Sequence, residues 1–156
     1  MAPLNRRQGL GLGLGLGLAW NGSASAGLAW VQDAGTLQGV RRGAYRSGGR
    51  DLTALVAQPT VSDGPMNGAA LVLLHGAGGI RRDFGNFYGN ARRLAALGYM
   101  VVMPDYFGDA DGGRGSDDPG RWTEAVKDAV SWTAGLRGVD PARVGVMGFS
   151  AGGHLT

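Results

Sequence analysis

A serine between two glycines is the feature of this sequence with the clearest capacity for chemistry. Residues 148–152 read Gly-Phe-Ser-Ala-Gly, which matches the pattern G-x-S-x-G, and the apolar run before them predicts a strand. In that setting the serine occupies a sharp strand-to-helix turn, and the two glycines let the backbone pack closely around it. The pattern predicts that Ser150 is the nucleophile of an acyl-transfer reaction, with a purely structural serine as the alternative.

A second glycine-rich run could stabilise the negative charge that such a reaction develops. Residues 75–79 read His-Gly-Ala-Gly-Gly and follow another apolar run. Two backbone N–H groups aimed at the developing oxyanion form an oxyanion hole, and we expect Ala77 and Ala151 to supply them. The alternative is a plain loop between a strand and a helix, but the order of the two runs along the chain favours the oxyanion hole.

The two histidines, His75 and His154, are both interpreted as structural. A histidine at the end of a strand is expected to orient the following loop by hydrogen bonding. His154 lies four residues after Ser150 and is expected to point along a helix rather than back at the hydroxyl. The chain has no cysteine, which excludes disulfides and thiolate ligands. The sequence therefore predicts no metal site and no cofactor.

Apolar runs and their spacing predict the elements that must position these residues. Strands are expected at 51–58, 69–74, 99–103 and 143–149, and helices at 86–97 and 122–136. Continuous apolar strands are typical of a parallel sheet that is buried on both faces. The order of these elements predicts an α/β fold, with a mostly parallel sheet, flanking helices and right-handed crossovers. Tyr106 and Phe107, after the third strand, either line a pocket over the site or pack in the core or at its rim.

The first 26 residues predict an export signal. Arg6 and Arg7 precede an uncharged run of alternating glycine and leucine, and small residues at 24–26 follow. The arginine pair is similar to a twin-arginine signal, and the alternatives are a flexible Gly-Leu tail or a misassigned start of the sequence. The apolar run is too short to span a membrane, so we expect an exported bacterial protein, periplasmic or secreted, without a stable membrane span. Residues 27–50 are polar and glycine-rich and are expected to be irregular.

Composition excludes several other classes of function. The 156 residues are 44% hydrophobic and 17% charged, which is typical of a globular domain and not of a disordered chain. The net charge of +3 falls close to neutral once Arg6 and Arg7 are set aside, and no basic stripe with interleaved aromatic residues occurs. We therefore expect no nucleic-acid partner. The oligomeric state stays open.

These motifs resemble those of the α/β-hydrolase superfamily, and within it the dienelactone hydrolase family. Residues 90–108 are similar to that family's succession of helix, strand and Pro-Asp-aromatic loop, and residues 140–153 to its approach to the nucleophile. The run from Gly148 equally resembles secreted carboxylesterases and acetyl esterases. The resemblance covers residues 52–156 and implies a serine hydrolase of carboxylic esters, with a small-molecule ester as its expected partner. Residues 51–156 are accordingly expected to form the N-terminal part of an α/β-hydrolase domain.

The sequence departs from that family in two respects. Dienelactone hydrolases use a cysteine nucleophile, whereas Ser150 stands here, which favours a general ester over a dienelactone. In this fold the acid and the base follow the serine along the chain, and only six residues follow Ser150. We expect the chain to be a fragment, truncated after the nucleophile, with little activity and an aggregation-prone sheet edge. A peptidase of the prolyl-oligopeptidase type and a non-catalytic truncated product are the alternatives.

Overall fold

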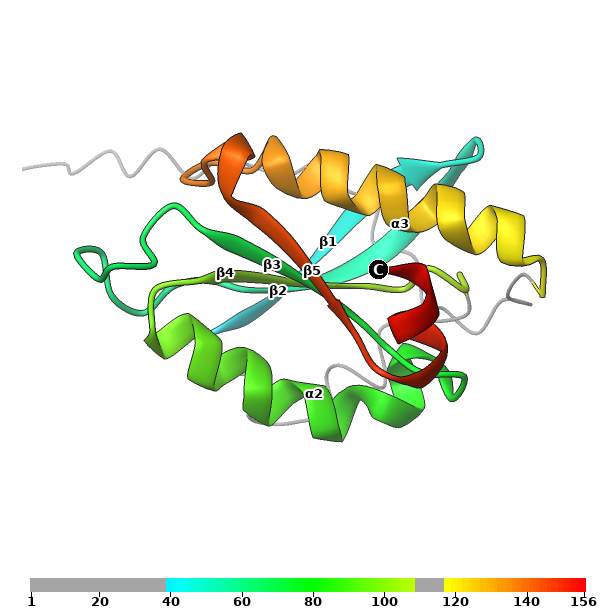
Figure 1. The fold of residues 1–156 in the computed structure, drawn as a ribbon, viewed down its shortest axis with the longest axis horizontal. Helices are drawn as coiled ribbons and strands as arrows, with labels where there is room; N and C mark the ends of the chain where they lie inside the picture. Colours follow the sequence, from blue (N-terminus) through cyan, green and yellow to red (C-terminus); the bar gives the residue numbers. More distant parts are fainter. Residues whose placement is uncertain (1–38, 109–116) are drawn as a thin grey trace, which may run out of the picture.

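The described part of the chain forms a five-stranded sheet with helices on both faces (Figure 1). The computed structural model describes residues 39–108 and 117–156, so the expected export signal at 1–26 lies outside the described residues. The strands are β1 (Val40–Ser47), β2 (Arg50–Ala57), β3 (Ala70–Leu74), β4 (Met100–Pro104) and β5 (Val144–Gly148). The helices are α2 (Gly79–Ala96), α3 (Pro119–Ala134) and the short 3-10 helices η1 (Pro141–Arg143) and η2 (Ser150–Leu155).

The strand order β1-β2-β4-β3-β5 decides which loops become neighbours. β3 pairs in parallel with both β4 and β5. β2 runs antiparallel to both of its neighbours, β1 and β4. Within the described sheet β2 is therefore the one strand that opposes the others. The α/β fold expected from the sequence is confirmed, as a mixed sheet.

Each face of the sheet buries its own apolar cluster. Leu52, Ala54 and Val56 of β2 belong to the cluster under α3, whereas Leu55 and Ala57 belong to the cluster under α2. Successive residues of a strand point to opposite faces, so β2 contributes to both clusters in turn. Figure 1 shows α3 above the sheet and α2 below it. This two-sided burial explains why the strand sequences are continuously apolar.

Aspartates before prolines fix the starts of α3 and η1. The side chain of Asp118 accepts a hydrogen bond from the Gly120 N–H at 2.9 Å, and the proline after it takes the first helical position. Asp140 accepts in the same way from the Ala142 N–H at 3.0 Å. The Asp-Pro start places the beginning of α3 at Pro119, three residues before the helix expected at 122–136.

The prediction that residues 27–50 are irregular is wrong for residues 40–50. Residues 40–50 form β1 and its turn into β2, so the sheet begins before residue 51. Gly48 and Gly49 have φ angles of +52° and +76°, as a tight two-residue hairpin turn requires. In β1, Tyr45 and Ser47 are buried while Arg46 between them is exposed. The arginines on the exposed side of β1 make the sequence look polar throughout, so its alternation of buried and exposed residues was not recognised.

Two other elements differ from their expected form. α2 begins at Gly79, well before the helix expected at 86–97, because glycines at 85 and 89 dilute its apolar spacing. β5 was expected to be a buried strand, but it lies at the edge of the described sheet and is partly exposed. Val146 is 36% exposed and Met147 55%, since β5 pairs with β3 alone among the described strands. Within the described ranges, no helix has the length and apolar character to cross a membrane.

A pair of leucine substitutions tests this assignment of the core. Leu55 is fully buried in the cluster under α2, whereas Leu97, after the end of α2, is 59% exposed. We expect Leu55→Ala to lower the free energy of unfolding by about 2–5 kcal/mol, because it leaves a cavity. The same change at Leu97 is expected to cost less than about 1 kcal/mol. Urea unfolding measures both, and equal losses would contradict the described packing.

Candidate active site

The carboxyl ends of β3 and β5 lie side by side because these two strands pair in parallel. Leu74, the last residue of β3, is in register with Gly148, the last residue of β5. The 75–79 loop after β3 and the turn with Ser150 after β5 therefore begin at the same edge of the sheet. β4 lies on the other side of β3, so the strand order reverses direction at β3. A crevice at the carboxyl ends of the strands is typical of such a switch point.

Ser150 occupies a strained turn directly after β5. Its φ angle is +52°, and among the described residues it is the one non-glycine residue with positive φ. Such a conformation costs about 1–3 kcal/mol and persists where the surroundings hold it. Here the Phe149 N–H donates to the Leu74 carbonyl at 3.2 Å, and the Gly152 N–H donates to the Phe149 carbonyl at 2.9 Å. Ser150 itself is exposed, so its side chain is accessible.

Two glycines allow the backbone to close around this turn. A Cβ atom on Gly152 would lie 2.5 Å from the carbonyl oxygen of His75 and 2.7 Å from that of Leu74. A Cβ atom on Gly148 would overlap the carbonyl group of Gly152. Neither position has room for a side chain unless backbone moves. The two glycines of the G-x-S-x-G pattern are thus required by the close approach of the turn to the end of β3.

The 75–79 loop lies next to the serine turn and is held by α2. Asp83, near the start of α2, accepts a hydrogen bond from the Gly76 N–H at 2.8 Å. A Cβ atom built on Gly76 would lie 3.5 Å from the Cβ of Ser150. Ala77 is exposed on this loop, and Ala151 follows Ser150 at the start of η2. The fold therefore places the loop that carries Ala77 against the turn that carries Ser150 and Ala151.

His75 is buried beneath this loop and is engaged on several sides. Its Nδ1 lies 2.9 Å from the Gly76 carbonyl oxygen, and because a carbonyl only accepts, Nδ1 carries the proton of that bond. The ring stacks on Tyr106 with centroids 4.0 Å apart, and the Tyr106 hydroxyl donates to the His75 carbonyl. The other ring nitrogen, Nε2, lies 3.9 Å from the carboxylate of Asp105. These contacts fit a residue that orients the loop.

His154 binds to the backbone of the serine turn. Its Nδ1 lies 3.0 Å from the carbonyl oxygen of Ser150, one turn earlier in the chain, and the residue is exposed. This contact ties the imidazole to the peptide group rather than to the hydroxyl. In the part of the chain that the structure describes, no group of three or more His, Asp and Glu side chains is arranged to hold a metal ion.

Two acidic residues that support the site were not singled out in the sequence. Asp83 has a recognisable signal, because it lies near the start of a helix that follows a glycine-rich loop, where a carboxylate finds backbone N–H donors. Asp105 is 1% exposed and accepts from the Gly108 N–H at 3.0 Å. Its signal is a carboxylate directly after a buried strand. Tyr106, for which both lining and packing were expected, is 1% exposed and packs on His75.

The sequence pattern of the Dienelactone hydrolase family matches residues 52–156 of this chain. The chain belongs to the dienelactone hydrolase family. The match runs from β2 to η2 and thus includes the 75–79 loop, the serine turn and the strands that hold them together.

Individual relatives show how much of the family's fold the chain spans. The protein YcjY of Escherichia coli (strain K12), described as uncharacterized, is 31% identical over 108 residues, which are 67% of this chain and 35% of that protein. An esterase of Pyrobaculum calidifontis is 27% identical, with a TM-score of 0.59 over 83% of this chain and 41% of the esterase. An esterase of Thermogutta terrifontis, 23% identical, shares the fold with a TM-score of 0.60 over 76% and 43% of the two chains. The chain thus spans roughly a third to two fifths of these relatives.

A glycine-to-alanine pair tests the close approach at the serine turn of this dienelactone hydrolase family member. We expect Gly152→Ala to lower the free energy of unfolding by at least about 2 kcal/mol, because the new methyl group meets two carbonyl oxygens of the β3 end. Gly89→Ala, in α2, meets no atom within 4 Å and is expected to stabilise by about 0.5–1 kcal/mol. Urea unfolding compares them. Equal effects would mean that β3 and the turn are not in contact.

The buried Tyr106 predicts a loss of stability in alkali. Burial raises the pKa of its hydroxyl, and the carboxylates of Asp83 and Asp105 raise it further. Above a pH of about 10, tyrosines of the unfolded chain release protons that folded Tyr106 retains, so the free energy of unfolding falls as pH rises. Tyr106→Phe removes this contribution, and we expect a shallower slope between about pH 10 and pH 11 in urea midpoints. An unchanged slope would show that the hydroxyl ionises freely in the folded state.

Proposed function

We propose that this chain carries the nucleophile of a serine hydrolase that cleaves carboxylic esters. The observation that carries the proposal is the backbone of Ser150. A serine with left-handed φ stands exposed at the end of a strand and next to a glycine-rich loop from the neighbouring strand. Strain of this kind at an exposed polar residue marks a functional position, because packing alone offers no reason to keep it. Membership of the dienelactone hydrolase family supports the same chemistry.

In the proposed reaction the Ser150 Oγ attacks the carbonyl carbon of the ester while a base takes the hydroxyl proton. The carbonyl oxygen becomes an oxyanion, to which the N–H groups of Ala77 and Ala151 donate hydrogen bonds. The ester C–O bond then breaks, the alcohol leaves with a proton, and an acyl-serine remains. Water attacks the acyl group, releases the carboxylic acid and restores the Ser150 hydroxyl.

The base of this reaction is proposed to come from outside the described residues. His75 is buried and bound to Gly76, and His154 is bound to the Ser150 carbonyl. In this fold the acid and the histidine follow the nucleophile along the chain. The matched part is less than half the length of the relatives. We propose that both groups belong to a longer form of the protein, after Thr156.

Esters of short carboxylic acids are the proposed substrates. The Thermogutta terrifontis esterase is known with propionate and with butyrate bound, and both are short carboxylic acids. Serine at position 150, where a dienelactone hydrolase proper has cysteine, supports a general ester over a dienelactone. The proposed reaction needs no cofactor. Export, which rests on the arginine pair and apolar run within residues 1–26, stays part of the proposal.

A fluorophosphonate, which reacts with activated serines, tests the proposed nucleophile. In the protein extended past Thr156 to the length of its relatives, we expect labelling that is lost in Ser150→Ala. Ser131→Ala is the matched control, because the Ser131 hydroxyl donates to the Lys127 carbonyl on α3 and is expected to take no part. Residues 1–156 alone are expected to label more slowly by about 10³-fold or more, because the base is missing.

Two outcomes would contradict the proposal. Labelling of the extended protein that persists in Ser150→Ala would place the reactive serine elsewhere. Equally fast labelling of residues 1–156 and of the extended protein would show that a base within this chain activates Ser150, which would overturn the proposed origin of the base.

A further inference from the structure

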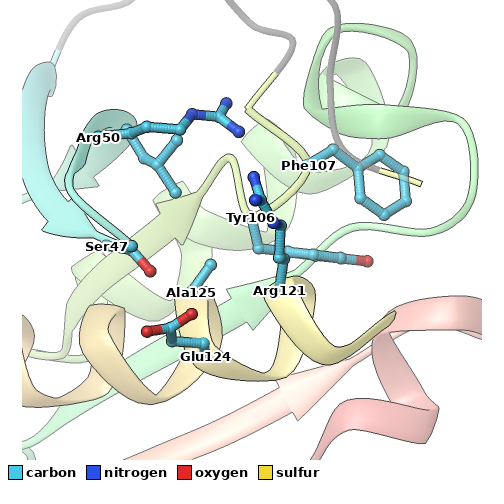
Figure 2. Close-up of a pocket in the computed structure, with 9 residues that line it drawn as sticks. Ser47, Arg50, Tyr106, Phe107, Arg121, Glu124 and Ala125 are labelled. Atoms are coloured by element: carbon cyan, nitrogen blue, oxygen red, sulfur yellow. The ribbon is translucent and has the colours of Figure 1, made fainter. Parts of the chain in front are cut away.

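A small pocket lies at the same end of the sheet as Ser150, beside β4. It has a volume of about 110 Å³ and is enclosed by the β1–β2 turn, the residues after β4 and the first turns of α3 (Figure 2). A pocket of this size is too small for a drug-sized ligand, but it holds a few waters or a ligand of a few non-hydrogen atoms. Tyr106 and Phe107 form one wall, and both rings also pack on His75.

Two guanidinium groups from different elements line this pocket. Arg50 begins β2 and Arg121 lies in the first turn of α3 (Figure 2). The Arg50 Nη2 donates to the Gly108 carbonyl at 3.5 Å, and a Cβ atom on Gly108 would overlap this guanidinium. The glycine thus leaves the space that Arg50 occupies. Arg121 makes a long, exposed contact with Asp118, 4.0 Å from Nε to the carboxylate, which leaves its Nη groups for another partner.

A carboxylate and a hydroxyl line the same space. Glu124 and Ser47 both line the pocket. Ser47 is 8% exposed as a whole residue, but its hydroxyl oxygen remains accessible from the pocket and makes no hydrogen bond to another residue in the described ranges. Among those residues Glu124 and Arg50 form no ion pair, although both line so small a pocket. Two guanidinium groups and a carboxylate therefore line one pocket, and no ion pair joins Glu124 to either arginine in the described ranges.

We propose that this pocket binds a small amino acid of about the size of glycine, with its carboxylate between Arg50 and Arg121 and its ammonium group against Glu124 and Ser47. The planar fork of an arginine matches a carboxylate, and two arginines give charge-assisted bonds from both sides. An ammonium group donates to a carboxylate and a hydroxyl at once. A zwitterion thus engages both sets of polar groups, whereas a simple anion engages the two guanidinium groups alone. The site is independent of the Ser150 chemistry.

Nuclear magnetic resonance titration of the chain tests this proposal, with the side-chain N–H signals of arginine as the readout. The probes are glycine, acetate and methylamine, which present both charges, the anion alone and the cation alone. We expect saturable shifts of the Arg50 and Arg121 signals with glycine, and affinities for acetate and methylamine that are weaker by about tenfold or more. Non-saturable shifts with glycine, or acetate that binds as tightly as glycine, would overturn the proposal.

Variants locate the two halves of the ligand. Arg50→Gln is expected to weaken the binding of both glycine and acetate by about tenfold, since it removes a guanidinium contact to the carboxylate. Glu124→Gln keeps the Arg50–Gly108 contact. It is expected to weaken the binding of glycine and to leave the binding of acetate unchanged or tighter. Arg137→Gln is the matched control, because Arg137 is exposed and does not line the pocket. Equal loss of glycine and acetate in Glu124→Gln, or an effect of Arg137→Gln as large as that of Arg50→Gln, would contradict the assignment.

Discussion

The parallel pairing of β3 with β5 is the constraint on which the candidate active site depends. Because Leu74 and Gly148 are in register, the loop after β3 and the turn after β5 begin at the same level. A slip of one residue would turn every side chain of β5 to the opposite face and separate Ser150 from the loop. The Phe149 N–H, which donates to the Leu74 carbonyl, extends the ladder by one bond and carries this register into the turn.

The strain at Ser150 is tolerated because its neighbours leave the turn little freedom. Gly148 and Gly152 let the two backbones approach to a distance that no side chain permits, and Asp83 fixes the facing loop through the Gly76 N–H. Beneath them, His75 is held by Tyr106 on its ring face. The turn is therefore placed by backbone contacts and buried side chains, while the exposed hydroxyl is free to meet a substrate. Such a division is what a preorganised nucleophile requires.

Much of this arrangement could be predicted from the sequence, because its main signals are local. The run that ends at Leu74 and the glycines around Ser150 gave the strand, the turn and the order of the motifs. The N-terminal strand could not be predicted, since its alternation of Tyr45 and Ser47 with arginines reads as a polar segment. Asp83 and Asp105 were missed for another reason. The sequence places Asp83 near the start of a helix and Asp105 directly after a strand, but it does not show which groups they contact, which are the Gly76 N–H and the His75 ring.

The connection through α3 has a consequence for how the molecule assembles. β3, α2 and β4 follow one another closely along the chain. The connection from β4 to β5 runs through α3, and β5 then pairs on the other side of β3, with Val144 opposite Ala70, far back along the chain. Closing so long a loop costs entropy before any contact repays it, and non-local strand pairing slows folding. We expect β5 to join the sheet late, when the β3–β4 unit is already formed. Ser150 would then adopt its left-handed backbone conformation in the last stage of folding, after the β3–β4 unit has formed.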